Sequence, residues 1–185
     1  MPTIEQTAGG SAPERAWTSE PTRLSAAEVP ELTDFLRRAD LTLSGLDAPT
    51  LRLWLLRDRD GTVRGSTGYE LDATGEHALI RSVAVDDEWR GRNLGLALGR
   101  FALDQAAAEG AVRAWLFSRR SGGFWQRLGF ASADRAALAR TLAETRQVKL
   151  FVESGQLERE VAWSRPLPVS PAESPTAGAT GCSPR

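Results

Sequence analysis

Residues 78–117 contain an apolar run, a loop rich in glycine and arginine, a helical pattern and a second apolar run. The first run, Ala78–Val85, has many branched side chains and an almost continuous apolar character, which predicts a buried central strand. The segment Leu94–Glu109 repeats apolar residues at helical spacing and is followed by Gly110, a common helix stop. A strand, a helix and a strand in this order predict a right-handed crossover between parallel strands. We therefore expect an α/β fold.

Two further strand-like runs precede this unit and make the sheet a mixed one. Leu51–Leu56 and Val63–Leu71 are joined through Asp60-Gly61, which predicts a β-hairpin, and another turn leads into the central strand. The first part of the sheet is thus expected to be antiparallel, with helices on both faces of the whole sheet. The other predicted elements are a helix through Leu32–Ala39, a short helix over Gly123–Leu128, an extended stretch from Phe130, a helix from Asp134 to about Ala143 and a strand near Glu160–Ser164.

The composition of the two ends differs from that of the middle. Residues 1–22 and 167–185 are rich in Gly, Pro, Ser and Thr and poor in apolar residues, which predicts flexible tails. Residues 23–166 have the size and the apolar content of one ordinary domain. We therefore expect a single folded domain between two tails.

Charge and residue counts narrow the classes of partner. The formal net charge is -1, so no basic surface for nucleic acid is indicated. Cys182 is the only cysteine and His77 the only histidine, so no internal disulfide and no Cys/His metal site are expected. No apolar run reaches the ~20 residues of a membrane span, and the first residues do not resemble a secretory signal. We expect a cytoplasmic protein without a metal and without a membrane partner.

The loop Arg90–Gly95 carries the first indication of chemistry. A helix start leaves backbone N–H groups unpaired, so a loop that bends onto it forms a pocket for an anion such as a pyrophosphate. Gly91 and Gly95 allow the backbone to approach a ligand, and Arg90 and Arg92 add positive charge. The alternative is a solvated turn. The position of the loop between the strongest strand and the clearest helix favours the pocket.

Two motifs together resemble a known family. Arg90–Gly95 resembles the acyl-CoA loop of GNAT acetyltransferases, Q/R-x-x-G-x-G/A, and Phe124–Phe130 is similar to their F-Y-x-x-x-G-F motif, in the same order and at the usual separation. The resemblance extends over Leu24–Arg165. Within the superfamily it is greatest to the small acetyltransferases found with arsenic-resistance operons, which in turn look like the acetyltransferase domain of N-acetylglutamate synthases. A GNAT fold implies a mixed sheet whose central parallel strands splay apart.

The resemblance also implies a reaction. In this family acetyl-CoA is the co-substrate, no metal is needed, and a neutral amine of a small molecule attacks the thioester directly while both substrates are bound. An amino acid or an amino-acid-like toxin is one candidate for that small molecule. Backbone groups on the central strand would bind the pantetheine arm and polarise the acetyl carbonyl, and N–H groups of the loop would hold the pyrophosphate. The residues implied for the co-substrate are Val83, Ala84, Val85, Arg90, Gly91, Arg92, Asn93, Leu94, Gly95 and Leu96.

Two positions depart from the family pattern. Asn93 stands where the loop usually has glycine, and asparagine is the residue that best tolerates a positive φ after glycine. Trp125 stands where many relatives have the tyrosine assigned to protonate the departing thiolate, and an indole cannot do this. The general acid is therefore unassigned, with water as one alternative. The missing tyrosine also keeps open a catalytically weak GNAT fold that binds acyl-CoA as a sensor or regulatory module.

The acceptor side is less defined by the sequence. The amine must lose a proton before it attacks, and a carboxylate or water must take that proton. Glu70 is the best-placed candidate, whereas Asp72 and Glu76 are expected to be exposed loop carboxylates. Arg81 either points into the cleft, where it could pair with a substrate carboxylate, or reaches the sheet surface. Together with Trp125, it is a candidate for substrate binding. The resemblance adds a possible homodimer.

Overall fold

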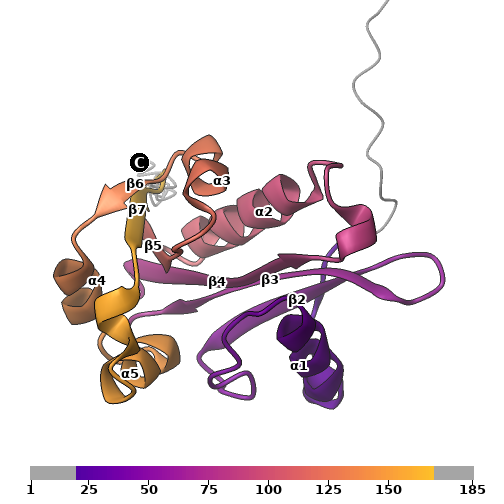
Figure 1. Cartoon of the computed structure of the whole chain (residues 1–185), viewed down its shortest axis with the longest axis horizontal. Coiled ribbons are helices and arrows are strands. Elements are labelled where there is room, and N and C mark those ends of the chain that lie inside the picture. The colour runs from indigo at the N-terminus through magenta and orange to yellow at the C-terminus, as the bar shows by residue number, and fades with distance from the viewer. Residues whose placement is uncertain (1–19, 169–185) are drawn as a thin grey trace, which may run out of the picture.

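The computed structural model describes residues 20–168 (Figure 1). One seven-stranded sheet runs in the order β1-β2-β3-β4-β5-β7-β6, and every pair is antiparallel except β4 and β5. The predicted mixed sheet with one parallel central pair is confirmed. The strands are β1 (Thr22–Arg23), β2 (Leu51–Arg57), β3 (Val63–Leu71), β4 (His77–Val85), β5 (Arg113–Phe117), β6 (Ala131–Ala133) and β7 (Ala162–Pro166).

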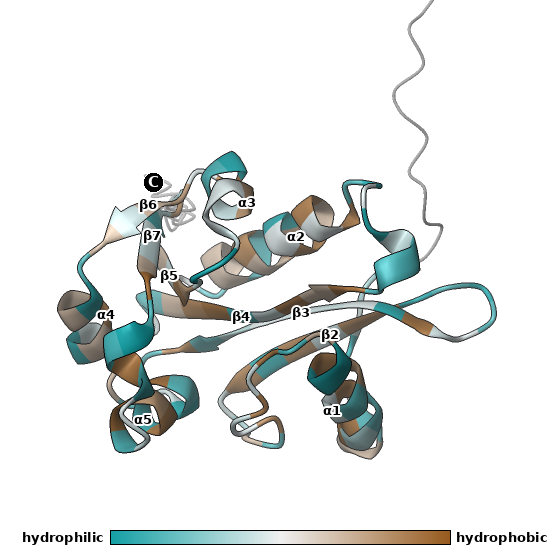
Figure 2. Ribbon diagram, in the orientation of Figure 1, coloured by the Kyte–Doolittle hydropathy of each residue, from teal (hydrophilic) through white to brown (hydrophobic). Residues whose placement is uncertain are grey.

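Helices cover both faces of the sheet, as expected (Figure 1). They are α1 (Val29–Arg38), α2 (Leu94–Ala108), α3 (Gly122–Arg127), α4 (Arg135–Thr141) and α5 (Arg146–Glu153). Successive strand residues face opposite sides, and the core clusters follow this rule. Ala78 and Ile80 pack with α2 and α3, whereas Leu79, between them, packs with α4 and α5. Helix α1 covers the start of the same second face, and the brown, apolar sides of the helices turn toward the strands (Figure 2).

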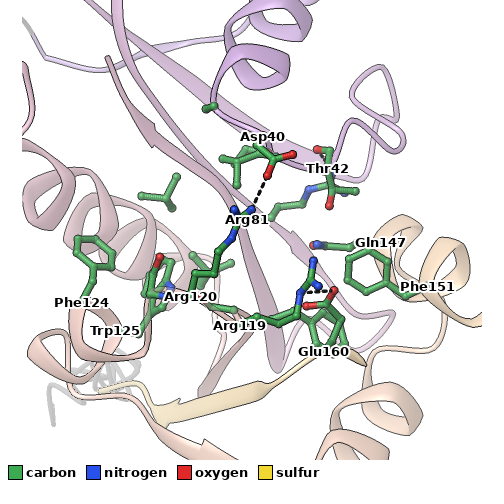
Figure 3. A pocket seen from close by; sticks show the side chains of 18 of the residues that line it. Asp40, Thr42, Arg81, Arg119, Arg120, Phe124, Trp125, Gln147, Phe151 and Glu160 are labelled. Carbon is green, nitrogen blue, oxygen red and sulfur yellow. Dashed lines mark hydrogen bonds and ion pairs between the residues drawn. The ribbon is translucent and has the colours of Figure 1, made fainter. Parts of the chain in front are cut away.

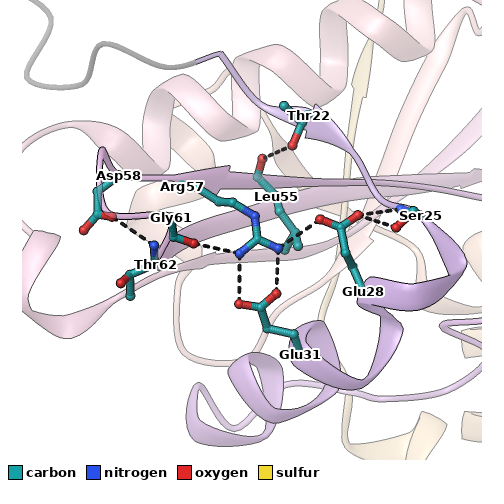
Figure 4. Close-up of polar contacts among 9 residues, drawn as sticks. All are labelled: Thr22, Ser25, Glu28, Glu31, Leu55, Arg57, Asp58, Gly61 and Thr62. Atoms are coloured by element: carbon teal, nitrogen blue, oxygen red, sulfur yellow. Dashed lines mark hydrogen bonds and ion pairs between the residues drawn. The ribbon is translucent and has the colours of Figure 1, made fainter.

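A polar cluster ties α1 to the first hairpin (Figure 4). The guanidinium of Arg57, at the end of β2, donates to Glu28 at 2.9 Å, to Glu31 at 2.6 Å and to the carbonyl of Gly61 at 2.9 Å. Glu28 also accepts hydrogen bonds from Ser25. These bonds, with the Arg57 contact, lower the pKa of Glu28 to about 2. The cluster fixes the entry of α1 on the side of the sheet away from α2.

Some elements differ from the sequence expectations. Helix α5 was not predicted, although Val148 and Phe151 stand at helical spacing and are buried. Helix α4 ends shortly before α5 begins, so the sequence of this segment indicated one helix followed by a loop. Strand β7 begins at Ala162, two residues later than expected. Thr22 pairs with β2, and the buried Leu167 donates its N–H to the carbonyl of Val112 at 2.8 Å. Residues 1–19 and 169–185 of the two predicted tails lie outside the described residues.

The parallel pair splits along its length. Only the first three residues of β4, His77 to Leu79, pair with β5, and beyond them β4 runs on to Val85 with no described strand on that edge. A bulge in the β3–β4 ladder accompanies the split. At the bulge, Ser82 has a φ of 58° and its carbonyl accepts a hydrogen bond from Ser66 at 2.7 Å. Bulges of this kind bend a strand and increase its twist. The split leaves an open wedge between β4 and β5.

Candidate active site

Two cavities open at the wedge, and they share part of their walls. The loop cavity, of about 530 Å³, lies against the end of β4 and the start of α2. The charged cavity, of about 500 Å³, lies between the middle of β4 and the segment that follows β5. Ala39, Leu41, Val83, Ser121 and Phe124 line both. A molecule in one cavity can therefore meet a molecule in the other.

The loop cavity is built by a tight turn onto a helix start. Asp86 accepts a hydrogen bond from the N–H of Glu88 at 3.0 Å and opens a short 3₁₀ turn, Asp87–Trp89. Gly91 and Asn93 then adopt positive φ angles of 78° and 59°. The left-handed conformation expected of Asn93 is confirmed. The turn delivers the first N–H groups of α2, which have no partners within the helix, to the cavity.

The residues predicted for the co-substrate gather here with one exception. All of them except Arg92 line the loop cavity; Arg92 lies with its guanidinium 5.2 Å from the centre of the Trp89 ring. Arg90 forms an exposed ion pair with Asp87 at 2.7 Å. Arg127, which the sequence analysis did not select, is a further cation on the wall. The positive charge therefore lies at the rim, because Arg90 and Arg127 are both exposed.

Gly95 lies where two walls of the loop cavity come close together. A Cβ atom at this position would lie 3.2 Å from the Phe124 ring and 3.6 Å from Val85. The absence of a side chain therefore keeps open the gap between α2, α3 and the end of β4. By contrast, a Cβ at Gly91 would meet nothing within 4 Å, and its requirement for glycine comes from its positive φ.

Arg81 lines the charged cavity and does not reach the outer sheet surface. The residue is only 5% exposed, and its Nη2 donates to the carbonyls of Ser44 at 2.8 Å and Thr42 at 3.5 Å. Burial lowers the pKa of Arg81 to about 10, and the nearby Glu70 partly opposes this shift, so the guanidinium is charged at neutral pH. Its Nε and Nη1 atoms have no hydrogen-bond partner among residues 20–168.

Glu70 lies behind Arg81 and lines neither cavity. Its Oε1 accepts a hydrogen bond from the Thr50 hydroxyl at 2.9 Å, and its Oε2 accepts one from the N–H of Arg146 at 3.0 Å. The same Oε2 lies 3.9 Å from Nη1 of Arg81. The carboxylate is thus 2% exposed and joins β3, β4, the β2 entry and the start of α5. Asp72 and Glu76 lie in the β3–β4 turn and do not line either cavity.

Trp125 lies on α3 in the wall of the charged cavity. Its ring makes edge contacts with Phe124 and Phe130, at centroid distances of 4.8 and 5.5 Å, and the residue is 8% exposed. The indole of Trp125 is thus held in the cavity wall by its packing against these two rings.

The sequence analysis missed several polar residues of the charged cavity (Figure 3). Glu160 is 7% exposed, with its Oε1 3.4 Å from Nε of Arg119, and Arg120 is paired with Asp40. Gln147 comes from α5. These residues belong to segments far apart along the chain, so no local pattern could have grouped them. Among the described residues, no cluster of three or more His, Cys, Asp or Glu side chains could hold a metal ion.

A comparison with protein families agrees with this geometry. The model of the acetyltransferase (GNAT) family matches residues 14–130. The chain belongs to this family. No curated protein sequence matches the chain significantly.

GNAT structures share the fold at low sequence identity. N-acetylglutamate synthase from Neisseria gonorrhoeae, complexed with coenzyme A and N-acetyl-glutamate, matches 80% of this chain with a TM-score of 0.61 and 16% identity; the chain spans only 35% of that synthase. Rv2747 from Mycobacterium tuberculosis, in complex with CoA and NLQ, matches 81% of this chain over its whole length, with a TM-score of 0.63 and 18% identity. A GNAT acetyltransferase from Staphylococcus aureus Mu50 matches 80%, and 99% of its own length, with a TM-score of 0.61 and 13% identity. None of the described helices of this GNAT chain is long and apolar enough to cross a membrane.

Proposed function

We propose that the protein transfers the acetyl group of acetyl-CoA to the amine of a small molecule by direct attack in a ternary complex. The observation that carries the proposal is the continuity of the two cavities at the point where β4 and β5 part. One cavity has the helix start that a pyrophosphate requires, and the other has the buried polar groups that an acceptor requires. CoA in two of the structural neighbours adds support from the fold.

The loop cavity fits acetyl-CoA in three ways. The open start of α2 can hold the pyrophosphate, and the cations at the rim, Arg90 and Arg127, add attraction for it. The edge of β4 at Val83–Val85 has no strand partner among the described residues, so its backbone groups are free to pair with the amides of the pantetheine arm. An N–H on this edge would also polarise the acetyl carbonyl.

The acceptor amine would enter through the charged cavity, with Arg81 and Trp125 in its wall. The sequence suggested Glu70 as the base that takes the amine proton. Because both oxygens of Glu70 already accept hydrogen bonds and the residue does not line the cavity, we propose that it positions Arg81 instead. In that case Glu70→Gln should change the acceptor KM more than it changes the pH dependence of kcat.

A second candidate function is an acyl-CoA sensor with little or no catalysis. The observation that favours it is Trp125, because its indole occupies the site of the usual proton donor and offers no hydroxyl. In the acetyltransferase, the group that protonates the CoA thiolate is unassigned, with water as one candidate.

Two measurements test these functions. Calorimetric titration of the full chain with acetyl-CoA should show binding at one site per chain for both candidates. CoA release in the presence of a panel of amines should then be seen only for the acetyltransferase. No acetyl-CoA binding at all would contradict both.

Finer assignments rest on the sequence. We propose a relationship to the acetyltransferases of arsenic-resistance operons on the similarity of Leu79–Val85 and of the segment Arg135–Val148. A cytoplasmic location and a homodimer stay predictions; sedimentation of the purified chain tests the second.

A further inference from the structure

The charged cavity has in its wall one buried cation with unpaired donors, Arg81, and one carboxylate oxygen that accepts no hydrogen bond from residues 20–168, Oε2 of Glu160. Arg81 belongs to β4. Glu160 lies between a 3₁₀ turn, Gln156–Arg159, and β7, beside the segment that follows β5. The two side chains therefore come from the two sides of the wedge (Figure 3). Each is more than nine-tenths buried. Buried charged groups normally have their hydrogen bonds satisfied, so the two unpaired nitrogens of Arg81 need an explanation.

Arg81 uses only one of its three nitrogens for hydrogen bonds with the protein. Nη2 donates to the loop after α1, through the carbonyls of Thr42 and Ser44, and Nε and Nη1 have no partner within residues 20–168. The nearest carboxylate oxygen, on Glu70, is 3.9 Å from Nη1 and already accepts the N–H of Arg146. A guanidinium with free donors beside a cavity is suited to an oxyanion of a ligand.

Of the two carboxylate oxygens of Glu160, one accepts a hydrogen bond and the other accepts none from residues 20–168. Its Oε1 accepts a hydrogen bond from Gln156 at 3.0 Å and lies 3.4 Å from Nε of Arg119. No residue of the described chain donates to Oε2. Arg119 is the one charged side chain in contact with this carboxylate within residues 20–168. The ion pair holds Glu160 in place while its second oxygen remains available to a cation.

Three further charged side chains line the cavity, and one of them, Arg119, is already paired with Glu160. Arg120 and Asp40 form an exposed ion pair with each other at the mouth. After this pair is set aside, a cation with free donors remains on the β4 side and a free carboxylate oxygen on the other side. A ligand that offers an oxyanion to Arg81 and an N–H donor to Glu160 is the complement of this wall.

We propose that the acceptor is an amine that also carries a carboxylate or a similar small oxyanion, with the oxyanion bound by Arg81 and the ammonium proton taken by Oε2 of Glu160. This deepens the proposed function and rests on it. Glu160 is then a catalytic residue, because it contacts the reacting amine. Arg119 and Gln156 are positioning residues that act through it.

The proton and electron balance of the step is complete. The ammonium of the acceptor loses one proton to Glu160, and the nitrogen lone pair attacks the thioester carbonyl carbon. The C–N bond forms as the C–S bond breaks, and the sulfur leaves with the bonding electrons. The second proton of the nitrogen passes through water to the CoA sulfur, while Glu160 returns its proton to solvent. The products are the N-acetylated acid, free CoA and one proton.

The first test needs no variant. Amino acids and the amines that remain when their carboxylate is removed, such as phenylalanine with 2-phenylethylamine and leucine with 3-methylbutylamine, form matched pairs. We expect kcat/KM to be at least tenfold higher for the carboxylate member of any pair that reacts. Calorimetry in the presence of CoA gives a second readout, in which only the carboxylate members should bind. Equal rates or equal affinities within every pair would overturn the proposal.

Variants separate the two residues. Arg81→Gln should reduce the preference within each pair to about twofold, whereas Arg37→Gln, a change in an exposed ion pair on α1, should leave it unchanged. Glu160→Gln keeps an oxygen for Gln156 and should lower kcat at least tenfold at pH 7. That loss should shrink as the pH rises toward 9, because solvent then supplies the free amine. Glu158→Gln, in an exposed ion pair nearby, is its control.

The outcomes distinguish this proposal from the proposed function. If acetyl-CoA is bound but no amine releases CoA, the acetyltransferase fails, and the calorimetry still decides whether carboxylates bind. If decarboxylated amines react as well as their acids, the acetyltransferase stands and the carboxylate proposal fails. If Arg81→Gln does not fold, the matched pairs on the native chain and the pH profile of Glu160→Gln decide between the two outcomes. A loss in Glu160→Gln that is constant with pH would assign that residue a structural role only.

Discussion

The two cavities at the β4–β5 split are built by different principles. The loop cavity draws most of its wall from residues 83–96, and its polar groups are backbone N–H groups with arginines at the rim. The charged cavity is lined by residues of the segment after α1, of β4, of the segment after β5, of α3 and α5, and of the chain just before β7. Most of the loop cavity thus comes from a single stretch of chain, whereas the charged cavity is formed by segments that lie far apart along it.

This difference separates two tasks of an acyltransferase. A turn onto a helix start supplies backbone N–H groups for a co-substrate phosphate whatever the neighbouring side chains are. An individual acceptor requires particular side chains, and here these come from segments far apart along the chain. Changes in the charged cavity should therefore affect the fold and the acceptor, whereas changes in the loop cavity should affect acetyl-CoA.

The largest effect is expected from Arg81→Met, which leaves the buried carboxylate of Glu70 without its cation. Removal of one partner of a buried pair costs about 3–5 kcal/mol in the free energy of unfolding. The double variant with Glu70→Gln should recover a large part of that loss, because no buried charge remains. Urea unfolding of the three proteins measures both effects. A single variant as stable as the native chain would mean that the pair is not a structural support of the charged cavity.

Trp125 tests the wall of the charged cavity. Trp125→Ala should lower the free energy of unfolding by about 3 kcal/mol or more, because it removes a buried ring that contacts Phe124 and Phe130. Trp125→Tyr keeps an aromatic ring and restores the hydroxyl that the family motif has at this position, so turnover should be equal or higher. Urea unfolding and CoA release are the measurements. A stably folded tyrosine variant with much lower turnover would show that the indole has its own role in acceptor binding.

The same difference explains how much could be predicted from the sequence. The strand–loop–helix unit, the parallel pair and the mixed sheet were predicted because their signals are local: branched apolar residues, glycines at the turn and helical spacing. The conformation of Asn93 followed from its residue type. By contrast, the split itself depends on a bulge at Ser82, and no local pattern marks a serine with a positive φ inside a strand.

The acceptor side could not be derived in this way. Glu160 was predicted as the start of a strand, and α5 was missed. Both contribute to the charged cavity only after the chain has folded around β4, so no local pattern marks them as part of the site. Glu70 lies on β3 as expected, but its bonds to Thr50 and Arg146 join segments 20 and 76 residues away. Long-range partners of this kind determine whether a carboxylate is a base or a support.

Gly95→Val is the direct test of the loop cavity. Its Cβ would meet the Phe124 ring at 3.2 Å, and its methyl groups would fill the gap between α2 and the end of β4. We expect at least a tenfold loss of acetyl-CoA affinity, or about 1.4 kcal/mol. Arg100→Val is the control, since it places the same β-branched residue at an exposed position of α2 for a propensity cost of at most about 0.7 kcal/mol. Calorimetry and circular dichroism report binding and folding; native affinity in a folded Gly95→Val protein would remove this cavity as the acetyl-CoA site.

The acid sensitivity of the fold should come partly from outside both cavities. The pKa of Glu28 is lowered from 4.5 to about 2 by its hydrogen bonds with Ser25 and Arg57. The stability that this carboxylate contributes is therefore complete above about pH 4.5 and is lost as the pH falls toward 2. Glu28→Gln should have a lower Tm than the native chain at pH 6, with a smaller further drop between pH 5 and pH 2. Its acetyl-CoA affinity at pH 7 should be unchanged, and a loss there would link α1 to the loop cavity.

The smallest effect is expected at Asn93, where the backbone of the loop cavity already accepts a left-handed residue. Glycine removes the remaining strain of a positive φ but increases the conformational entropy of the unfolded chain by about 0.4–1 kcal/mol, so the two contributions nearly cancel. Asn93→Gly should thus match the native chain in Tm and in acetyl-CoA affinity. Asn93→Val should lose about 1–2 kcal/mol of stability, because a branched side chain is poorly tolerated at this φ. If Asn93→Gly instead binds acetyl-CoA much more weakly, the asparagine side chain itself contacts the ligand, and the loop cavity depends on more than its backbone.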